Sequence, residues 1–106
     1  MRKYRNVKAT VDGITFDSKK EANRYIQLRL LERSGHISDL RCQVKYELIP
    51  KQKDERKAEY IADFVYSEGG KTIAEDVKGY ATAVYKLKRK LFKYKYPDIE
   101  FREVKN

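Results

Sequence analysis

Residues 60–78 read Tyr-Ile-Ala-Asp-Phe-Val-Tyr-Ser-Glu-Gly-Gly-Lys-Thr-Ile-Ala-Glu-Asp-Val-Lys. Two runs rich in β-branched and aromatic residues flank a Glu-Gly-Gly turn, which is the pattern of a β-hairpin. Because side chains alternate between the faces of a strand, Asp76 and Lys78 share one face and Glu75 lies on the other. Asp63, on the partner strand, is expected to meet this pair across the hairpin. The stretch therefore predicts two carboxylates beside a lysine, a set able to hold a divalent cation and an attacking water.

The segments on either side of this hairpin complete an α+β pattern. Strands are recognised by alternating apolar and polar residues, and helices by capping residues and apolar spacings of three and four. The sequence predicts one domain over residues 1–106, with a mixed four-stranded sheet flanked by helices and a small N-terminal hairpin. The other expected elements are the small hairpin at 8–16, a helix from Ser18 to about Arg33, a strand from Leu40 that ends at Pro50, a helix from Thr82 to about Tyr96 and a strand at 99–104.

The apolar patterns also predict which sides of these elements face the core. In the strand that begins at Leu40, the even-numbered residues up to Leu48 are apolar or aromatic and should lie on one buried face. The helix at 18–33 carries more apolar residues than one stripe needs, so we expect it to be covered on more than one side. In the second helix the stripe predicted to face the core is Val84, Leu87, Leu91 and Tyr94.

The charge of the chain favours a polyanionic partner. Its 25 Lys and Arg residues against 16 Asp and Glu residues give a net charge of +9. Basic side chains that neutralise phosphates gain affinity by releasing counterions, so nucleic acid is the expected partner. Residues 82–96 contain six basic residues and no acidic one, and the four that fall together on one side are predicted to contact DNA: Lys86, Arg89, Lys90 and Lys93.

The sequence disfavours a site built on paired cysteines and a location in a membrane. Cys42 is the only cysteine, which excludes an intramolecular disulfide and a cysteine-based zinc site. No stretch approaches the length of apolar residues that spans a membrane, so no membrane partner is expected and a cytoplasmic location is predicted.

Asp63, followed after a short hairpin by Asp76-Val77-Lys78, resembles the signature of the PD-(D/E)XK nuclease superfamily. The likeness extends along the chain. Over residues 16–21, 35–43, 60–66 and 75–79 and the lysine-rich helix that follows, the sequence is similar to a small phage-encoded endonuclease-like family long filed as a domain of unknown function. Ala62 stands where the superfamily name has proline. The predicted order of elements agrees with the αβββαβ core that this resemblance implies.

The resemblance implies a Mg²⁺- or Mn²⁺-dependent endodeoxyribonuclease that leaves 5′-phosphate ends. Asp63 and Asp76 would hold the metal, Lys78 would orient or deprotonate the attacking water, and Glu21 from the first helix would complete the catalytic and metal-binding set. The family setting implies phage recombination or replication in the cytoplasm of a bacterial or phage-infected cell. It also implies a branched or flapped DNA substrate, such as a Holliday junction, and a homodimer with two active sites.

Several of these residues have a second interpretation. Glu21 lies three residues after Ser18, so it also fits a capping box at the start of the helix. Gln43 is either a contact to DNA or to the metal site, or an ordinary exposed glutamine. Thr82 is expected to cap the second helix and is also a candidate DNA contact. A bulge in the strand would exchange the roles of Glu75 and Asp76.

The mixed-charge loop at 51–59 offers a further set of candidate phosphate contacts. Its basic candidates are Lys53, Arg56 and Lys57. Loops of this composition are also commonly just solvated.

A non-catalytic, basic nucleic-acid-binding module with a nuclease-like fold is the alternative function. Charge and fold alone do not separate it from an enzyme. The acidic residues do favour the enzyme, because Asp63 and Asp76 on a surface meant for phosphates would repel the ligand unless a cation lay between them.

Overall fold

A computed structural model describes residues 7–77 and 81–105. The strands β3, β4, β5 and β6 form one sheet in that order, with β6 parallel to β5 and the other pairs antiparallel. The predicted α+β architecture with a mixed four-stranded sheet and a separate small hairpin is confirmed. The elements in chain order are β1 (Ala9–Val11), β2 (Ile14–Phe16), α1 (Lys19–Arg33), β3 (Ser38–Ile49), β4 (Ala58–Glu68), β5 (Lys71–Val77), α2 (Ala83–Lys95) and β6 (Glu100–Val104).

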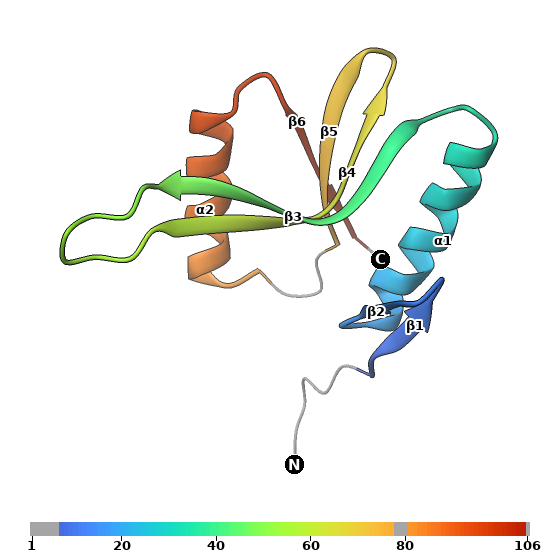
Figure 1. Ribbon diagram of the computed structural model, residues 1–106, viewed down its shortest axis with the longest axis horizontal. Coiled ribbons are helices and arrows are strands. Elements are labelled where there is room, and N and C mark those ends of the chain that lie inside the picture. The colour runs from blue at the N-terminus through green and yellow to red at the C-terminus, as the bar shows by residue number, and fades with distance from the viewer. Residues whose placement is uncertain (1–6, 78–80, 106) are drawn as a thin grey trace.

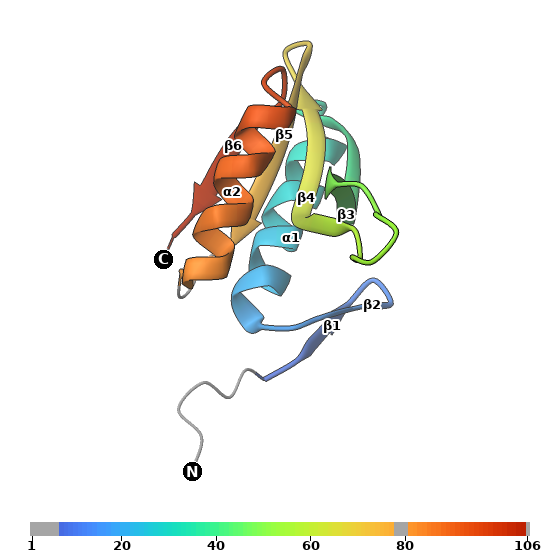
Figure 2. The same ribbon diagram turned by 90° about the vertical axis from the view of Figure 1, so that its left-hand side faces the viewer.

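The two helices lie on opposite faces of the sheet. Figure 1 shows α2 on one side of β4 and β5 and α1 on the other, and in Figure 2 α2 lies in front of the sheet and α1 behind it. The β1–β2 hairpin packs beside α1. The far ends of β3 and β4 extend beyond the sheet centre as a long hairpin.

Backbone geometry explains why the two predicted tight turns form where they do. Asp12 and Gly13 both have positive φ angles, of 53° and 77°, and Gly69 and Gly70 have φ angles of 56° and 81°. Two successive residues of positive φ make the turn whose twist matches that of antiparallel strands, and glycine adopts this conformation without steric cost. The second turn fixes the register of β4 against β5, and thereby the relative placement of their acidic residues.

Both helices begin at the predicted caps. The Ser18 hydroxyl accepts a hydrogen bond from the Glu21 backbone N–H at 3.2 Å, and the Thr82 hydroxyl accepts one from the Tyr85 backbone N–H at 3.1 Å. Each bond satisfies a backbone donor that the first turn of a helix leaves without an intrahelical acceptor. The predicted limits of the two helices are confirmed to within one residue.

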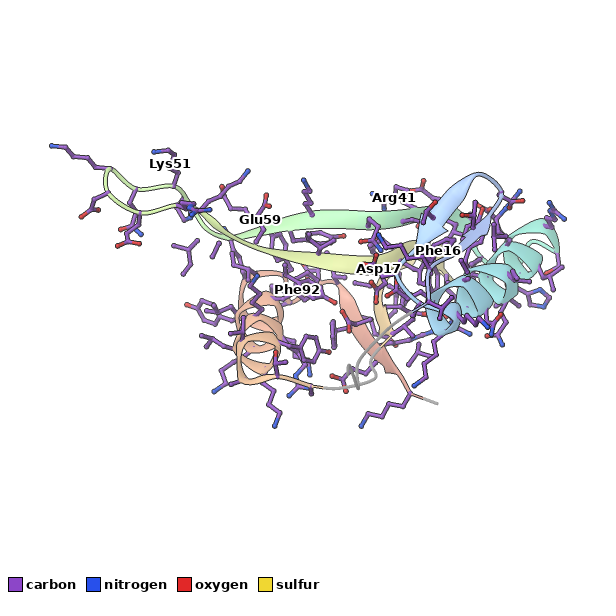
Figure 3. The ribbon with its side chains drawn as sticks, turned by 90° about the horizontal axis from the view of Figure 1, so that it is seen from below. Phe16, Asp17, Arg41, Lys51, Glu59 and Phe92 are labelled. Carbon is purple, nitrogen blue, oxygen red and sulfur yellow. The ribbon has the colours of Figure 1, made fainter. Side chains whose placement is uncertain are left out.

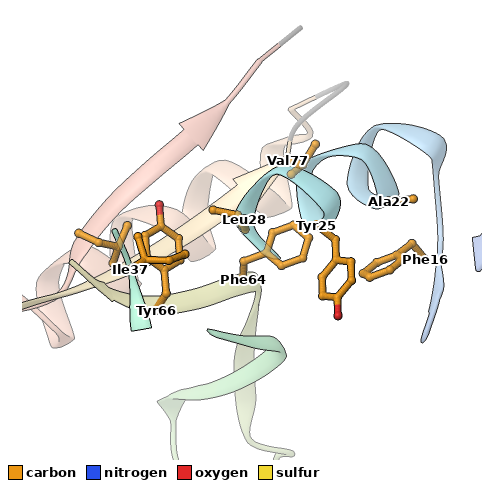
Figure 4. Packing of buried hydrophobic residues seen from close by; sticks show 9 residues of the cluster. Phe16, Ala22, Tyr25, Leu28, Ile37, Phe64, Tyr66 and Val77 are labelled. Carbon is orange, nitrogen blue, oxygen red and sulfur yellow. The ribbon is translucent and has the colours of Figure 1, made fainter. Parts of the chain in front are cut away.

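The core consists of two clusters, one on each face of the sheet. The first packs α1 and the β1–β2 hairpin against the sheet through Phe16, Tyr25, Leu28 and Phe64, and Figure 4 shows these side chains converging between the helix and the strands. The second packs α2 against the other face, where Phe92 is fully buried. The rings of Phe92 and Tyr46 lie 5.0 Å apart in an edge-to-face arrangement, which is favourable for aromatic pairs.

The long strand β3 contributes to both clusters, because it bends at Gln43. Leu40 and Cys42 pack with the first cluster, whereas Val44, Tyr46 and Leu48 lie in or against the second. Gln43, between these two groups, has a φ angle of 55°, which a non-glycine residue seldom adopts. The predicted alternation of the strand is therefore correct, but its inner face turns from one helix toward the other at this residue.

The prediction for the buried side of α2 was wrong except for Leu91, which packs against the second cluster. Val84, Leu87 and Tyr94 are 65%, 56% and 85% exposed, while Tyr85 and Phe92 face the sheet. The two sets have equally good helical spacing, so spacing alone could not choose between them. The aromatic rings are selected because the sheet offers them ring partners in Tyr46, Tyr60 and Phe101.

The prediction that α1 is covered on more than one side is confirmed only in part. The sheet contacts the helix at Arg24, which binds Glu75, and the β1–β2 hairpin contacts it at Arg29, which lies 3.6 Å from Asp12. The apolar residues Ile26, Leu30 and Leu31 are nevertheless 43%, 60% and 36% exposed. Neither helix in the described part of the chain has both the length and the apolar character needed to cross a membrane.

Candidate functional site

Hairpin register brings Asp63 and Asp76 to one place on the sheet. The pairing of β4 with β5 is continuous from Glu68 opposite Lys71 to Phe64 opposite Glu75. This pairing ends one residue short of Asp63 on β4 and one residue short of Asp76 on β5. Consistent with this, the Val77 backbone N–H donates to Asp63 Oδ2 at 2.7 Å. Asp63 therefore reaches the end of β5 next to Asp76, and binding of a metal by the two carboxylates stays a prediction.

Asp76 lies beneath α2 and is held by a tyrosine. Its side chain is 4% exposed, and the Tyr60 hydroxyl donates to Asp76 Oδ1 at 2.7 Å. Burial raises the pKa of Tyr60 far above its ordinary value, and the charge of Asp76 adds to this effect. Tyr60 therefore keeps its proton at physiological pH and acts as a permanent donor to the carboxylate.

Gln43 is the residue that the bend in β3 places beside Asp63. Its side-chain Nε2 lies 3.5 Å from Asp63 Oδ1, at the long end of the hydrogen-bond range. The side chain is exposed. The structure thus places Gln43 next to a predicted metal ligand, whereas the sequence left open whether it was only a surface glutamine.

Glu75 occupies the opposite face, against α1, and has different partners. It is fully buried, and Arg24 binds both of its oxygens, with Nε to Oε1 at 2.8 Å and Nη2 to Oε2 at 2.6 Å. The Tyr66 hydroxyl donates to the same carboxylate. The hydrogen bond to Glu75 raises the pKa of Arg24, so the guanidinium remains charged. Glu75 thus lies on the face of the sheet that α1 covers, whereas Asp76 lies on the other face beside Tyr60.

A third carboxylate lies beside Asp76 on the next strand. In the parallel pairing of β5 with β6, Asp76 lies opposite Glu103. Glu103 Oε2 accepts hydrogen bonds from the Tyr85 hydroxyl at 2.5 Å and from Arg89 Nη1 at 2.6 Å. The hydrogen bond from Tyr85, followed by the bond and charge of Arg89, lowers the pKa of Glu103. Glu103 thus lies next to Asp76 on the neighbouring strand and is already neutralised by Arg89.

The donor chemistry of this place fits a hard divalent cation. Mg²⁺ binds carboxylate oxygens and is commonly held by one or two of them, with water and substrate phosphate as its other ligands. Asp63 and Asp76 supply such a pair. Within residues 7–77 and 81–105 there is no group of three or more His, Cys, Asp or Glu side chains arranged to hold a metal ion, so Glu21 is not assembled with them into one cluster. Lys78, the predicted partner of the metal-bound water, lies outside the described residues.

The four predicted DNA-contacting residues of α2 line one groove. This shallow groove has a volume of about 600 Å³, and its walls are Ala83, Lys86, Leu87, Arg89, Lys90 and Lys93. The predicted grouping of the four basic side chains is confirmed. Arg89 also pairs with Glu103, and Lys93 Nζ lies 5.5 Å from the centre of the Phe101 ring. The groove therefore runs along the side of α2 that borders β6.

The other candidate DNA contacts lie at two different places. Thr82 is exposed at the N-terminus of α2, where its role as a helix cap is confirmed. Lys53, Arg56 and Lys57 belong to the exposed loop at the end of the β3–β4 hairpin. Figure 3 shows Lys51 of the same loop toward the far end of this hairpin, well separated from Phe92, which lies between α2 and the sheet.

Sequence reasoning did not find Tyr60 or the group formed by Tyr85, Arg89 and Glu103. Tyr60 and Phe64 are four residues apart on β4, so strict alternation would place both against α1. The bend near Gln43 instead turns Tyr60 to the other face, toward Asp76. Glu103 is placed by the parallel register of β6, which depends on the connection through α2 and is not encoded by local spacing. The alternation in the last strand was the available signal, because it places Phe101 and Glu103 on the same face. It does not say which residue of the adjacent strand lies beside Glu103.

Comparisons with known proteins place the chain in a family. A search of curated proteins and a search of solved structures each returned no match. A family model described as "Protein of unknown function (DUF1064)" matches residues 1–105. Since this match spans nearly the whole chain, the protein belongs to the DUF1064 family.

Proposed function

We propose that the protein is a metal-dependent DNA endonuclease whose active centre contains Asp63 and Asp76. The observation that carries this proposal is the placement of Asp63 beside Val77 and of Asp76 beside Tyr60 at the end of β5, with the basic groove of α2 nearby. Two acidic side chains at one end of a strand repel each other, and they also repel the phosphates that a basic surface attracts. A divalent cation between them and the DNA removes both conflicts.

The order of elements supports the same proposal. From α1 to β6 the chain runs αβββαβ, which is the order of the PD-(D/E)XK core that the sequence resembles. Asp76 lies one residue before the end of β5, and the basic helix α2 is the next element along the chain. A shared order of helices and strands does not establish a shared activity, because one fold supports many functions. The proposal therefore rests on Asp63 and Asp76.

The chain's own residues would hold this centre in place. The Val77 N–H fixes one oxygen of Asp63, and the Tyr60 hydroxyl fixes one oxygen of Asp76. A bound Mg²⁺ or Mn²⁺ would lower the pKa of an attacking water and stabilise the charge that develops on the phosphate. Lys86 and Lys90 would hold the flanking phosphates. The sequence pattern assigns Lys78 to orienting the attacking water. It also assigns Glu21 to the metal-binding set, although Glu21 does not form one cluster with Asp63 and Asp76 in the described part of the chain.

Hydrolysis would form a bond between the water oxygen and phosphorus and break the bond to the 3′ oxygen, leaving a 5′-phosphate. A branched substrate such as a Holliday junction or a flap, a role in phage recombination or replication and a homodimer follow from the sequence resemblance. The same resemblance implies that the protein acts in the bacterial cytoplasm.

The experiment is a cleavage assay with labelled duplex, single-stranded, flap and four-way-junction DNA in Mg²⁺, Mn²⁺ or EDTA. The parent protein is compared with Asp63→Asn and with Asp54→Asn, a matched exposed aspartate in the loop at the end of the β3–β4 hairpin. We expect metal-dependent cutting by the parent and by Asp54→Asn, and its loss in Asp63→Asn. If none of the substrates is cut in either metal while DNA is still bound, the protein is a binding module and the proposal is wrong.

A further inference from the structure

The side of α2 that faces away from the sheet carries exposed apolar side chains. Val84, Leu87 and Tyr94 are 65%, 56% and 85% exposed. Spacings of three and seven residues place them along one side of a helix with 3.6 residues per turn. Exposed single apolar residues are ordinary, but a row of them on one helix indicates a contact surface.

Basic side chains border this apolar row on both sides. At 3.6 residues per turn, Lys86, Lys90 and Lys93 lie along one edge, and Lys88 and Lys95 lie along the other. Leu87 lines the groove together with the lysines of the first edge. The helix contains no acidic residue, so this surface presents positive charge around an apolar centre.

A second copy of the chain would not complement this surface, because two helices of the same positive charge repel each other. Duplex DNA would complement the lysines but not the apolar row, since its base faces are covered by stacking. Unpaired nucleotides satisfy both, because they offer phosphates to the lysines and uncovered base faces to an aromatic or apolar side chain.

We infer that the outward side of α2 binds an unpaired stretch of the DNA substrate, with bases against Tyr94 and Leu87 and phosphates against the flanking lysines. The inference rests on the proposed function and narrows its substrate class to DNA with a single-stranded segment near the cleavage site. The start of α2 lies close to the carboxylates, because Tyr85 in its first turn bonds Glu103, the neighbour of Asp76. An unpaired strand along α2 therefore leads toward Asp63 and Asp76.

The test compares binding of a labelled 20-nucleotide oligo-dT with binding of a labelled 20-base-pair duplex, by fluorescence anisotropy in EDTA at fixed salt. The variants are Tyr94→Ser and Leu87→Ser, with Tyr94→Phe as the conservative replacement. Leu30→Ser on α1 is the matched control, because Leu30 is 60% exposed on the opposite side of the sheet. All three positions are at the surface, and circular dichroism checks that each of the four variants is folded.

We expect Tyr94→Ser and Leu87→Ser to weaken oligo-dT binding about tenfold each, as loss of one base-stacking contact does. Duplex binding should change by less than about twofold, since it depends on phosphate contacts that these variants keep. Tyr94→Phe and Leu30→Ser should leave both affinities unchanged.

Equal losses for both DNAs, or no loss for oligo-dT, would overturn the inference. A change in the sedimentation coefficient of Leu87→Ser with unchanged DNA binding would show that the surface instead joins two copies. These outcomes are separate from the fate of the proposed function. If the parent cuts DNA and the variants bind oligo-dT normally, only the inference is lost; if nothing is cut, the proposed function is lost while the binding result stands.

Discussion

Replacing Arg24 with leucine removes the cation that binds a fully buried carboxylate. Glu75 is 0% exposed and receives two hydrogen bonds from Arg24, at 2.8 and 2.6 Å. Removing one partner of a buried ion pair typically costs about 3–5 kcal/mol, because the other charge is left without compensation. Arg24 is itself 23% exposed, so we expect the lower end of this range. Such a loss is a large share of the roughly 5–15 kcal/mol that stabilises a domain.

The assay is urea unfolding followed by circular dichroism, together with the melting temperature. Unfolding entropy is about 2.1 cal/mol/K per residue, so a loss of about 3 kcal/mol in a chain of 106 residues lowers the melting temperature by roughly 14 °C. The control is Arg41→Leu, whose 3.5 Å pair with Asp39 is exposed and should contribute less than about 1 kcal/mol. The double variant Arg24→Leu/Glu75→Leu should recover much of the loss, because no buried charge remains.

A loss below about 1 kcal/mol in Arg24→Leu, or a double variant as unstable as the single one, would refute this account of Glu75. The distinction matters for the site, because Glu75 and Asp76 are adjacent acidic residues. If Glu75 is structural, its replacement lowers stability, whereas Asp76→Asn keeps an oxygen that accepts from Tyr60 and should act mainly on catalysis.

Three further predictions concern the other face of the sheet. Tyr60→Phe should lower the free energy of unfolding by about 1.5–3 kcal/mol, as loss of a hydrogen bond to a charged group does, and should slow cleavage, measured by urea titration and initial rates. The pKa of Glu103 is lowered in the folded state. Its ionised side chain therefore stabilises the fold above its unfolded pKa of about 4.3, and this effect is lost as the pH falls through the folded pKa. The difference in unfolding free energy between the parent and Glu103→Gln should shrink below about pH 4.3. Mg²⁺ at ten times its Kd should stabilise the parent by about 1.4 kcal/mol in thermal unfolding and should have no effect on Asp63→Asn.

The local features of the fold could be predicted from the sequence because each has a local cause. The Asp12-Gly13 and Gly69-Gly70 turns need residues that tolerate positive φ, and Ser18 and Thr82 supply the helix caps. The meeting of Asp63 with Asp76 follows from the second turn, which sets the register of the hairpin. These contacts lie within a few residues or within one hairpin.

The features that could not be predicted depend on partners distant in the sequence. The buried side of α2 is decided by aromatic residues on three strands, and the sequence offers two stripes of equal spacing. The bend at Gln43 turns Tyr60 toward Asp76, and the alternating sequence of β3 does not predict this bend. The parallel register of β6 brings Glu103 beside Asp76 in the same way.

The central claim is that Asp76 acts in catalysis and is not needed for DNA binding. The most direct measurement is the single-turnover cleavage rate of Asp76→Asn relative to the parent in Mg²⁺, with the affinity for the same DNA measured in EDTA. The account predicts a rate at least about a hundredfold lower with affinity unchanged or improved, because one negative charge is removed beside the phosphates. An unchanged cleavage rate in Asp76→Asn would contradict it.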